Sequence, residues 1–308
     1  MNTDLNLEPL GDSSSVTKIS LPVAGRQDLR CNPVPGESSR VDQATGTTLP
    51  LGEWRSSRPR FSCQGLCVDY RHHRALEDVN LEIGHHEVIA LLGPSGSGRS
   101  TFLRCLNRMN DVIPGCRVTG KLLLDGRDIH APGEDIVTLR AHVGMVFQRP
   151  NPYPKSIHEN IAYGSRIHGL ASNRLEENVI VETVLRQVGL WKEVKGLLDR
   201  PALHLSLGQQ QRLCMARVLA TEPDVMLMDE PCASLDPGSA SLIERLIEEL
   251  RESYSIVLVT HSLQQAARVS QRTAFFCRGR LIEVGSTAQM FINPRHPLTD
   301  CYISGRYL

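Results

Sequence analysis

Short strand-like runs alternate along the chain with longer segments of helical periodicity. The predicted strands are residues 79–83, 87–92, 121–126, 143–147, 224–228 and 255–260. The most apolar of these runs are typical of strands that are buried on both faces of a sheet. Because helical segments separate most of them, the pattern predicts an α/β fold with a parallel sheet. An Asp-Gly pair at the end of 121–126 predicts a tight turn.

Two regions show a clear helical pattern. Residues 155–215 are predicted to be mostly helical, with one apolar face made of Leu175, Val179, Val184, Leu185 and Val188. A further helix is predicted to begin at Asp236 and Pro237, because proline is favoured in the first turn. Its predicted apolar face consists of Leu242, Ile243, Leu246, Ile247 and Leu250.

Composition narrows the possible classes of protein. The 308 residues include 34 basic and 34 acidic side chains, and this zero net charge argues against a dedicated nucleic-acid-binding protein. No apolar run approaches the roughly 20 residues that span a bilayer, and the N-terminus lacks a secretory apolar core. The nine scattered cysteines fit a reducing, cytoplasmic setting. Residues 1–58 are predicted to form a disordered or loosely ordered extension, because they are rich in small polar residues, glycine and proline.

Residues 93–101 form a glycine-rich loop of the type that binds phosphate groups. They are Gly93, Pro94, Ser95, Gly96, Ser97, Gly98, Arg99, Ser100 and Thr101. Glycines let the backbone approach phosphates closely, and the loop amides and the next helix N-terminus attract anions. A predicted strand precedes the loop, and residues 100–110 have apolar residues at helical spacing. This context favours a nucleotide site over an ordinary glycine-rich turn.

Four polar residues directly follow predicted core strands. They are Gln148, Asp229, Glu230 and His261. Ligands bind beyond the carboxyl ends of parallel strands, so these side chains are expected close to the loop. We expect Asp229 to hold Mg²⁺ with the Ser100 hydroxyl, and Glu230 to act as the general base toward water. A solvated acidic turn and a structural histidine are the alternatives, and the glycine-rich loop favours the functional interpretation.

These motifs, in this order, resemble those of the ATP-binding subunits of ABC transporters over residues 61–308. The resemblance implies ATP hydrolysis with Mg²⁺ on a P-loop core, with a small antiparallel β subdomain and a helical subdomain near residues 150–215. It also implies the role of each matching residue. Tyr70 corresponds to the aromatic residue that stacks on adenine, Gln148 to the glutamine that contacts Mg²⁺ and water, and His261 to the histidine that contacts the γ-phosphate. The signature is 205–209, with Ser206, Gly208 and Gln209 as nucleotide contacts.

Five further stretches resemble the ATP-binding subunits of phosphate importers in particular. They are residues 104–115, 148–157, 158–164, 264–270 and 302–306. The resemblance implies a peripheral protein on the cytoplasmic face of the bacterial inner membrane. Its implied partners are a second copy in a head-to-tail ATP-sandwich dimer, two transmembrane permease subunits and, indirectly, a periplasmic phosphate-binding protein. An importer of another substrate, such as an amino acid, is the alternative. A nucleic-acid partner is not expected.

The prolines of 148–157 predict a stiff segment beside Gln148, because each proline fixes its own φ and restricts the residue before it. Such a segment would transmit the nucleotide state to the membrane partner, whereas a passive connector is the alternative.

Three positions depart from the family pattern. Arg99 stands where the phosphate loop has lysine, Leu207 stands where the signature has glycine, and residues 232–234 are Cys-Ala-Ser instead of Thr-Ser-Ala. A guanidinium is larger and less compact than an ammonium group, so Arg99 is expected to misplace the γ-phosphate. In the implied dimer Leu207 faces the same phosphate from the other subunit. We expect reduced but real hydrolysis, and a weakly active or inactive regulatory subunit is the alternative.

Overall fold

A computed structural model describes residues 40–41 and 48–306. The chain divides into two units, residues 1–34 with 308 and residues 35–307, and every described residue belongs to the second. Most of the extension predicted for 1–58 therefore lies outside the described residues. In its described part, β1 (Arg40–Val41) pairs with β2 (Thr48–Leu49). Strand β3 (Leu51–Gly52) pairs with β13 (Arg280–Ser286).

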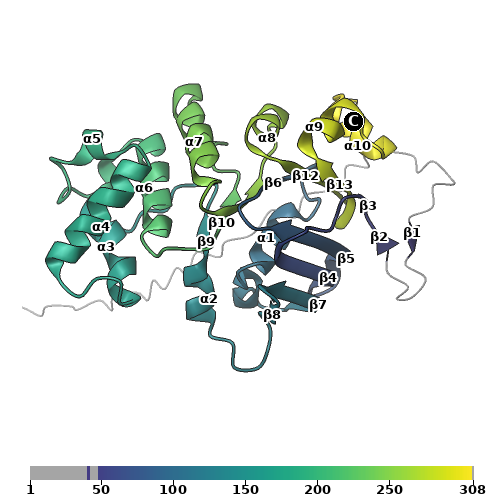
Figure 1. Cartoon of the computed structure of the whole chain (residues 1–308), viewed down its shortest axis with the longest axis horizontal. Helices are drawn as coiled ribbons and strands as arrows, with labels where there is room; N and C mark the ends of the chain where they lie inside the picture. Colours follow the sequence, from purple (N-terminus) through teal and green to yellow (C-terminus); the bar gives the residue numbers. More distant parts are fainter. Residues whose placement is uncertain (1–39, 42–47, 307–308) are drawn as a thin grey trace, which may run out of the picture. The chain divides into compact units, whose positions relative to one another are not determined.

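A mixed sheet forms the centre of this unit (Figure 1). Within the described residues it has seven strands in the order β3-β13-β12-β6-β11-β10-β9. Five of these strands are β6 (Val88–Leu92), β9 (Val143–Val146), β10 (Val225–Asp229), β11 (Ser255–Val259) and β12 (Arg272–Cys277). Neighbours from β12 to β9 pair in parallel, whereas β12 pairs antiparallel with β13. The predicted α/β fold with a parallel-dominated sheet is thus confirmed.

A second, antiparallel sheet has the order β5-β4-β7-β8. Its strands are β4 (Pro59–Tyr70), β5 (His73–Gly84), β7 (Cys116–Leu124) and β8 (Arg127–Asp128). Asp125 and Gly126 link the last two strands with φ values of 48° and 79°. Two consecutive left-handed residues give the tight hairpin turn that the Asp-Gly pair predicts.

Ten α-helices lie within residues 99–303 of the described part. They are α1 (Arg99–Cys105), α2 (Ile136–His142), α3 (Ile157–Ile167), α4 (Arg174–Gln187), α5 (Trp191–Val194), α6 (Leu207–Leu219), α7 (Pro237–Leu250), α8 (Leu263–Val269), α9 (Thr287–Ile292) and α10 (Pro297–Ile303). Short 3₁₀ turns occupy Met109–Val112 and Ala202–His204. Helix α1 ends earlier than the predicted 100–110 segment. Arg108 takes a left-handed φ of 57°, which an α-helix cannot accommodate.

The predicted apolar face over 175–188 was correct for three of its five residues. Val184, Leu185 and Val188 are buried, but Leu175 and Val179 are 74% and 61% exposed. A step of five residues from Val179 to Val184 turns about 140° past a full turn, so the exposed and the buried residues occupy different faces. Val181 completes the buried face instead. In α7 the predicted face is buried apart from Leu242, which is 41% exposed.

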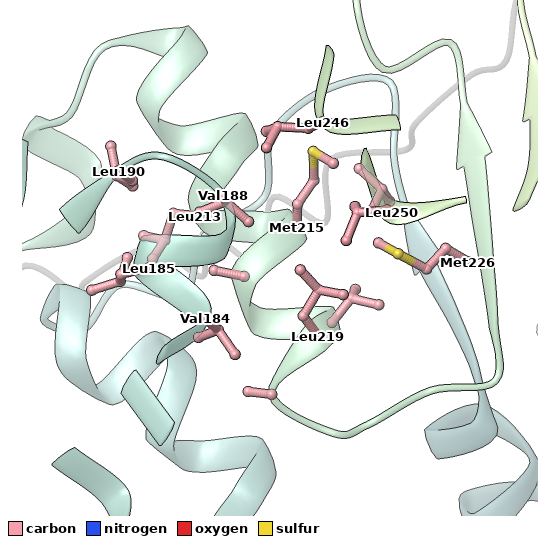
Figure 2. Packing of buried hydrophobic residues seen from close by; sticks show 14 of the residues in the cluster. Val184, Leu185, Val188, Leu190, Leu213, Met215, Leu219, Met226, Leu246 and Leu250 are labelled. Carbon is pink, nitrogen blue, oxygen red and sulfur yellow. The ribbon is translucent and has the colours of Figure 1, made fainter. Parts of the chain in front are cut away.

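The helical region and the sheet share one hydrophobic core (Figure 2). Helix α6 runs through it: Leu213, Met215 and Leu219 pack among residues of α4, β10 and α7. A second core surrounds α1, where Phe102 and Leu103 pack against residues of both sheets. Through Phe102 and Leu103, the second core fixes α1, and with it the glycine-rich loop, against the carboxyl end of β6.

Candidate functional site

The glycine-rich loop connects β6 to α1, as predicted. Gly93 has a φ of 146°, and a Cβ there would lie 2.1 Å from the carbonyl oxygen of Phe276. Gly98 caps α1 with a φ of 101°, and a Cβ there would lie 2.6 Å from Leu76 Cδ2. Both positions combine a left-handed backbone with close packing, so only glycine fits them.

The loop offers unused hydrogen-bonding capacity of the kind that phosphate groups take. Ser97 is 2% exposed, and its Oγ has no hydrogen-bond partner among the described groups. A buried hydroxyl normally has a partner, so an orphan in this loop is a vacant donor. Gly98 provides no side chain to cap the first turn of α1. The residues present therefore fit the phosphates of ATP.

Ser100 and Asp229 meet at the place predicted for magnesium. Ser100 Oγ donates a hydrogen bond of 2.8 Å to Asp229 Oδ1, joining the start of α1 to the end of β10. Arg104 Nη2 lies 3.7 Å from the other carboxylate oxygen. A hydroxyl and a carboxylate are hard oxygen ligands of the type Mg²⁺ takes beside a nucleotide. The pair therefore suits a magnesium ion.

Arg99 directs its charge at protein groups. Its side chain is buried, and burial lowers the pKa of its guanidinium. Nη1 donates a 2.9 Å hydrogen bond to the carbonyl oxygen of Thr260, and Nη2 lies 3.0 Å from His261 Nε2. The arginine thus spans from α1 to the residues that follow β11. A lysine at this position would carry a compact point charge and lacks the planar, two-nitrogen fork that makes these contacts.

Glu230 stands between two of the predicted catalytic residues. His261 Nε2 lies 2.6 Å from Glu230 Oε1, and Gln148 Nε2 donates a 3.1 Å hydrogen bond to Oε2. Glu230 has a φ of 49°, in the left-handed region that is costly for a residue with a side chain. Its N–H donates to the carbonyl oxygen of Val259 at 2.9 Å. Such local strain is typical of functional positions.

Tyr70 lies at the end of β4 and is half-buried. Its hydroxyl donates a 2.9 Å hydrogen bond to Asn110 Oδ1 and lies 3.5 Å from Thr101 Oγ1. Burial raises the pKa of this phenol. These contacts tie the tyrosine to the segment that follows the glycine-rich loop.

The signature residues lie apart from this constellation. Within residues 48–306, no hydrogen bond or ion pair joins Ser206, Gly208 or Gln209 to the glycine-rich loop. Ser206 and Gln209 instead form a capping box at the start of α6. A Cβ on Gly208 would lie 2.4 Å from Ser239 Oγ. The single chain therefore brings together the loop and Tyr70 and leaves the three predicted signature contacts elsewhere.

Leu207 fits its position without backbone strain. It is the first residue of α6 and does not have a positive φ. Leucine would be strained at this position only in a left-handed conformation, which it does not adopt. Its side chain is 53% exposed.

Three residues near these motifs were not predicted from sequence. Glu193 of α5 accepts hydrogen bonds of 2.8 Å from Gln209 and from Arg212, and Arg212 lowers its pKa. Asn110 accepts the hydrogen bond of the Tyr70 hydroxyl. Tyr302 of α10 donates to the Gly93 carbonyl oxygen at 3.1 Å. For Tyr302, the sequence did offer a signal. It lies in the tail 302–306, which resembles phosphate importers, but the resemblance implied no role for this tail.

The parallel-dominated sheet, the loop after β6 and the carboxylates after β10 define a mixed α/β P-loop ATPase. The chain belongs to the ABC transporter family, because the model of that family matches residues 76–233. It is an ATP-binding subunit, and ABC ATPases hydrolyse ATP to drive transport.

Two solved structures are similar. One is cbiO1 from Clostridium perfringens, described as part of the ABC transporter complex cbiONQ. Its TM-score is 0.67 at 28% identity, covering 77% of this chain and 92% of that one. The other is a bacterial Atm1-family ABC exporter with ATP bound. Its TM-score is 0.68 at 25% identity, covering 81% of this chain and 42% of that one. None of the helices described here is long and apolar enough to cross a membrane.

Proposed function

We propose that this ATPase energises the import of inorganic phosphate through an ABC transporter. The observation that carries the proposal is the segment 148–164, whose sequence resembles that of phosphate importers and begins at Gln148 beside Glu230. We propose that the ATP-binding domain covers residues 61–308, with a helical subdomain near 150–215. The extension 1–58 precedes it.

The proline-rich part of this segment is held by many polar contacts. Asn160 accepts a 2.7 Å hydrogen bond from Tyr153 N–H, and its amide donates to three carbonyl oxygens between positions 153 and 156. Arg217 donates to Asn151 and lies over the Tyr153 ring at 4.6 Å. These contacts support a stiff segment that carries movements of Gln148 to a membrane partner.

Each site residue has a proposed role. The glycine-rich loop binds the ATP phosphates, and Tyr70 stacks on adenine. Ser100, Gln148 and Asp229 hold Mg²⁺. Glu230 accepts a proton from the attacking water, as its contacts with His261 and Gln148 suit.

A second copy completes the site in this proposal. Ser206, Gly208 and Gln209 of one subunit contact the ATP bound to the other, in a head-to-tail dimer. The exposed Leu207 side chain then lies against the γ-phosphate. Two permease subunits bind the dimer at the cytoplasmic face of the inner membrane. A periplasmic phosphate-binding protein delivers the substrate to them.

Uptake of labelled phosphate tests the transport proposal. A strain that lacks this chain, and any redundant phosphate importer, is complemented with the native chain or with Glu230→Gln. We expect the native chain to restore phosphate uptake and the variant to fail. Restored uptake of an amino acid, with phosphate uptake unchanged, would assign the ATPase to a different importer.

A regulatory subunit is the second candidate function, and Arg99 favours it. The guanidinium is bound to Thr260 and His261, so it is not free to act as the compact cation of the phosphate loop. A subunit of this kind binds ATP and signals phosphate status without turnover. Measurable ATP binding with no hydrolysis in the assembled transporter would favour this candidate.

A further inference from the structure

Helix α10 touches the glycine-rich loop at its first residue. The Tyr302 hydroxyl donates a 3.1 Å hydrogen bond to the carbonyl oxygen of Gly93, which is 209 positions away in the chain. Burial raises the pKa of this phenol, so the hydroxyl keeps the proton that it donates at neutral pH. The contact joins the tail 302–306, to which no role has yet been assigned, to the nucleotide site.

The strands that support the loop also hold the tyrosine ring. Tyr302 packs on Phe275 of β12 with ring centroids 5.2 Å apart. The same apolar cluster includes Ala90 and Leu92 of β6, which leads directly into Gly93. The ring is therefore positioned by the strand that delivers the loop and by its neighbour.

The remainder of the tail ends α10 just after Tyr302. Gly305 has a φ of 70°, and its N–H donates to the Tyr302 carbonyl oxygen at 3.2 Å. Arg306 N–H donates to the Cys301 carbonyl oxygen at 2.9 Å. This pair of bonds, with a left-handed glycine, is a Schellman motif. Arg306 also pairs with Asp300. These contacts keep Tyr302 in the last turn of the helix.

The Gly93 carbonyl is a sensitive point of the loop. The next residue is Pro94, which has no N–H, and Gly93 itself takes a φ that only glycine tolerates. Glycine has a wider choice of conformations than other residues, even before a proline, so a hydrogen bond to its carbonyl oxygen favours one orientation of the peptide plane between these residues. The Tyr302 hydroxyl supplies such a contact.

We propose that Tyr302 is a positioning residue that holds the glycine-rich loop in its nucleotide-binding conformation. The tail 302–306 is then a brace that sets the affinity for nucleotide, without touching the nucleotide itself. The inference rests on the assignment of this loop as the ATP site. If the loop takes its binding conformation only part of the time, the apparent dissociation constant rises by the inverse of that fraction.

The test uses Tyr302→Phe, which keeps the ring on Phe275 and removes the hydroxyl. The matched control is Tyr254→Phe, another half-buried tyrosine, which packs against the core that contains α6. Binding of a fluorescent ATP analogue and of its ADP counterpart is measured on the full chain, well below its melting temperature. Loss of one hydrogen bond predicts about fivefold weaker binding of both nucleotides, and the control keeps the native affinity.

Gly305→Ala supplies a second, independent variant, because a side chain at its left-handed φ disturbs the end of α10. Gly305→Ala should also weaken the binding of both nucleotides. Hydrogen exchange of the peptide that contains residues 93–101 should be faster in both variants. Native affinity in Tyr302→Phe, with or without a lower melting temperature, would overturn the brace. Failure of the native chain to bind ATP would instead overturn the assignment of the loop.

Discussion

At the scale of single residues, the site departs from its family pattern chiefly at Arg99. Its guanidinium contacts Thr260 and His261, while the hydroxyl of Ser97 in the same loop has no hydrogen-bond partner among the described groups. The loop is therefore built to receive phosphate, yet its principal cation is directed at protein groups. Binding must compete with the Arg99 contacts, and the γ-phosphate must be placed beside a planar group.

Replacing Arg99 with lysine should raise the turnover number for ATP. Lysine gives the loop a compact point charge and releases His261, so we expect an increase on the order of 10- to 100-fold in kcat. Phosphate release under saturating ATP measures it. Arg186→Lys, at an exposed ion pair with Glu182, is the matched control and should leave the rate unchanged. Equal rates for the native chain and Arg99→Lys would show that the arginine is no defect.

Helix α6 is the element that carries the signature, and its first turn is closely packed. Ser206 caps it, and Gly208 packs directly against Ser239 of α7. A side chain at position 208 has no room, whereas the exposed Leu207 has ample room. This contrast explains how the chain tolerates leucine at one signature position and retains glycine at the next.

The contact between α6 and α7 predicts that substitutions at Gly208 and Ser239 have non-additive effects on stability. Gly208→Ala places its Cβ 2.7 Å from Ser239 Cβ, so we expect a loss of about 1–3 kcal/mol in the free energy of unfolding. Ser239→Gly removes that neighbour, and the double variant should therefore lose less than the sum of the two single variants. Urea unfolding of all four proteins measures this. Strictly additive losses of unfolding free energy would mean that there is no steric conflict between the two residues.

The ion pair between α5 and α6 predicts a pH-dependent stability. Arg212 holds the pKa of Glu193 below its ordinary value. The stabilisation is therefore present above the unfolded pKa of about 4.3 and is lost as pH falls through the folded pKa. At pH 7, Glu193→Gln should cost about 1 kcal/mol of unfolding free energy, because the carboxylate is partly exposed.

Below the folded pKa of Glu193, the native chain and Glu193→Gln should unfold at the same denaturant concentration. Glu182→Gln, at the exposed pair with Arg186, should have no measurable effect at any pH. A stability difference for Glu193→Gln that persists at acid pH would contradict a charge-based origin.

Sequence predicted the elements that depend on local pattern and missed contacts made between elements. The apolar runs located the core strands. The predicted apolar face of α4 was wrong at Leu175 and Val179, because these residues continue an apolar pattern that no other element of the described chain covers. The partner of Tyr302 lies 209 positions away, a separation that no local pattern encodes.

At the scale of the whole molecule, the glycine-rich loop and the signature lie in different places on one chain. In the proposed head-to-tail dimer, a second copy supplies the signature. We predict that Glu230→Gln, with ATP and Mg²⁺, sediments as a dimer and without nucleotide as a monomer, because retained ATP joins the two subunits.

Leu207→Asp tests the dimer geometry. It places a negative charge where the partner's γ-phosphate is proposed to lie, and like charges repel. Introduced into Glu230→Gln, it should abolish the ATP-dependent dimer while each monomer still binds ATP. A dimer that tolerates the aspartate, or one that forms without nucleotide, would contradict the proposed arrangement.

ATP hydrolysis by the purified full-length chain tests the assignment of the ATPase centre most directly. We predict that the native chain releases phosphate from ATP, that Glu230→Gln is about 100-fold slower or more, and that both bind ATP with the same affinity. The loss would identify Glu230, between His261 and Gln148, as the general base. Equal phosphate release by the two proteins, or ATP binding without release by the native chain and by Arg99→Lys alike, would contradict the assignment of this site as an ATPase centre.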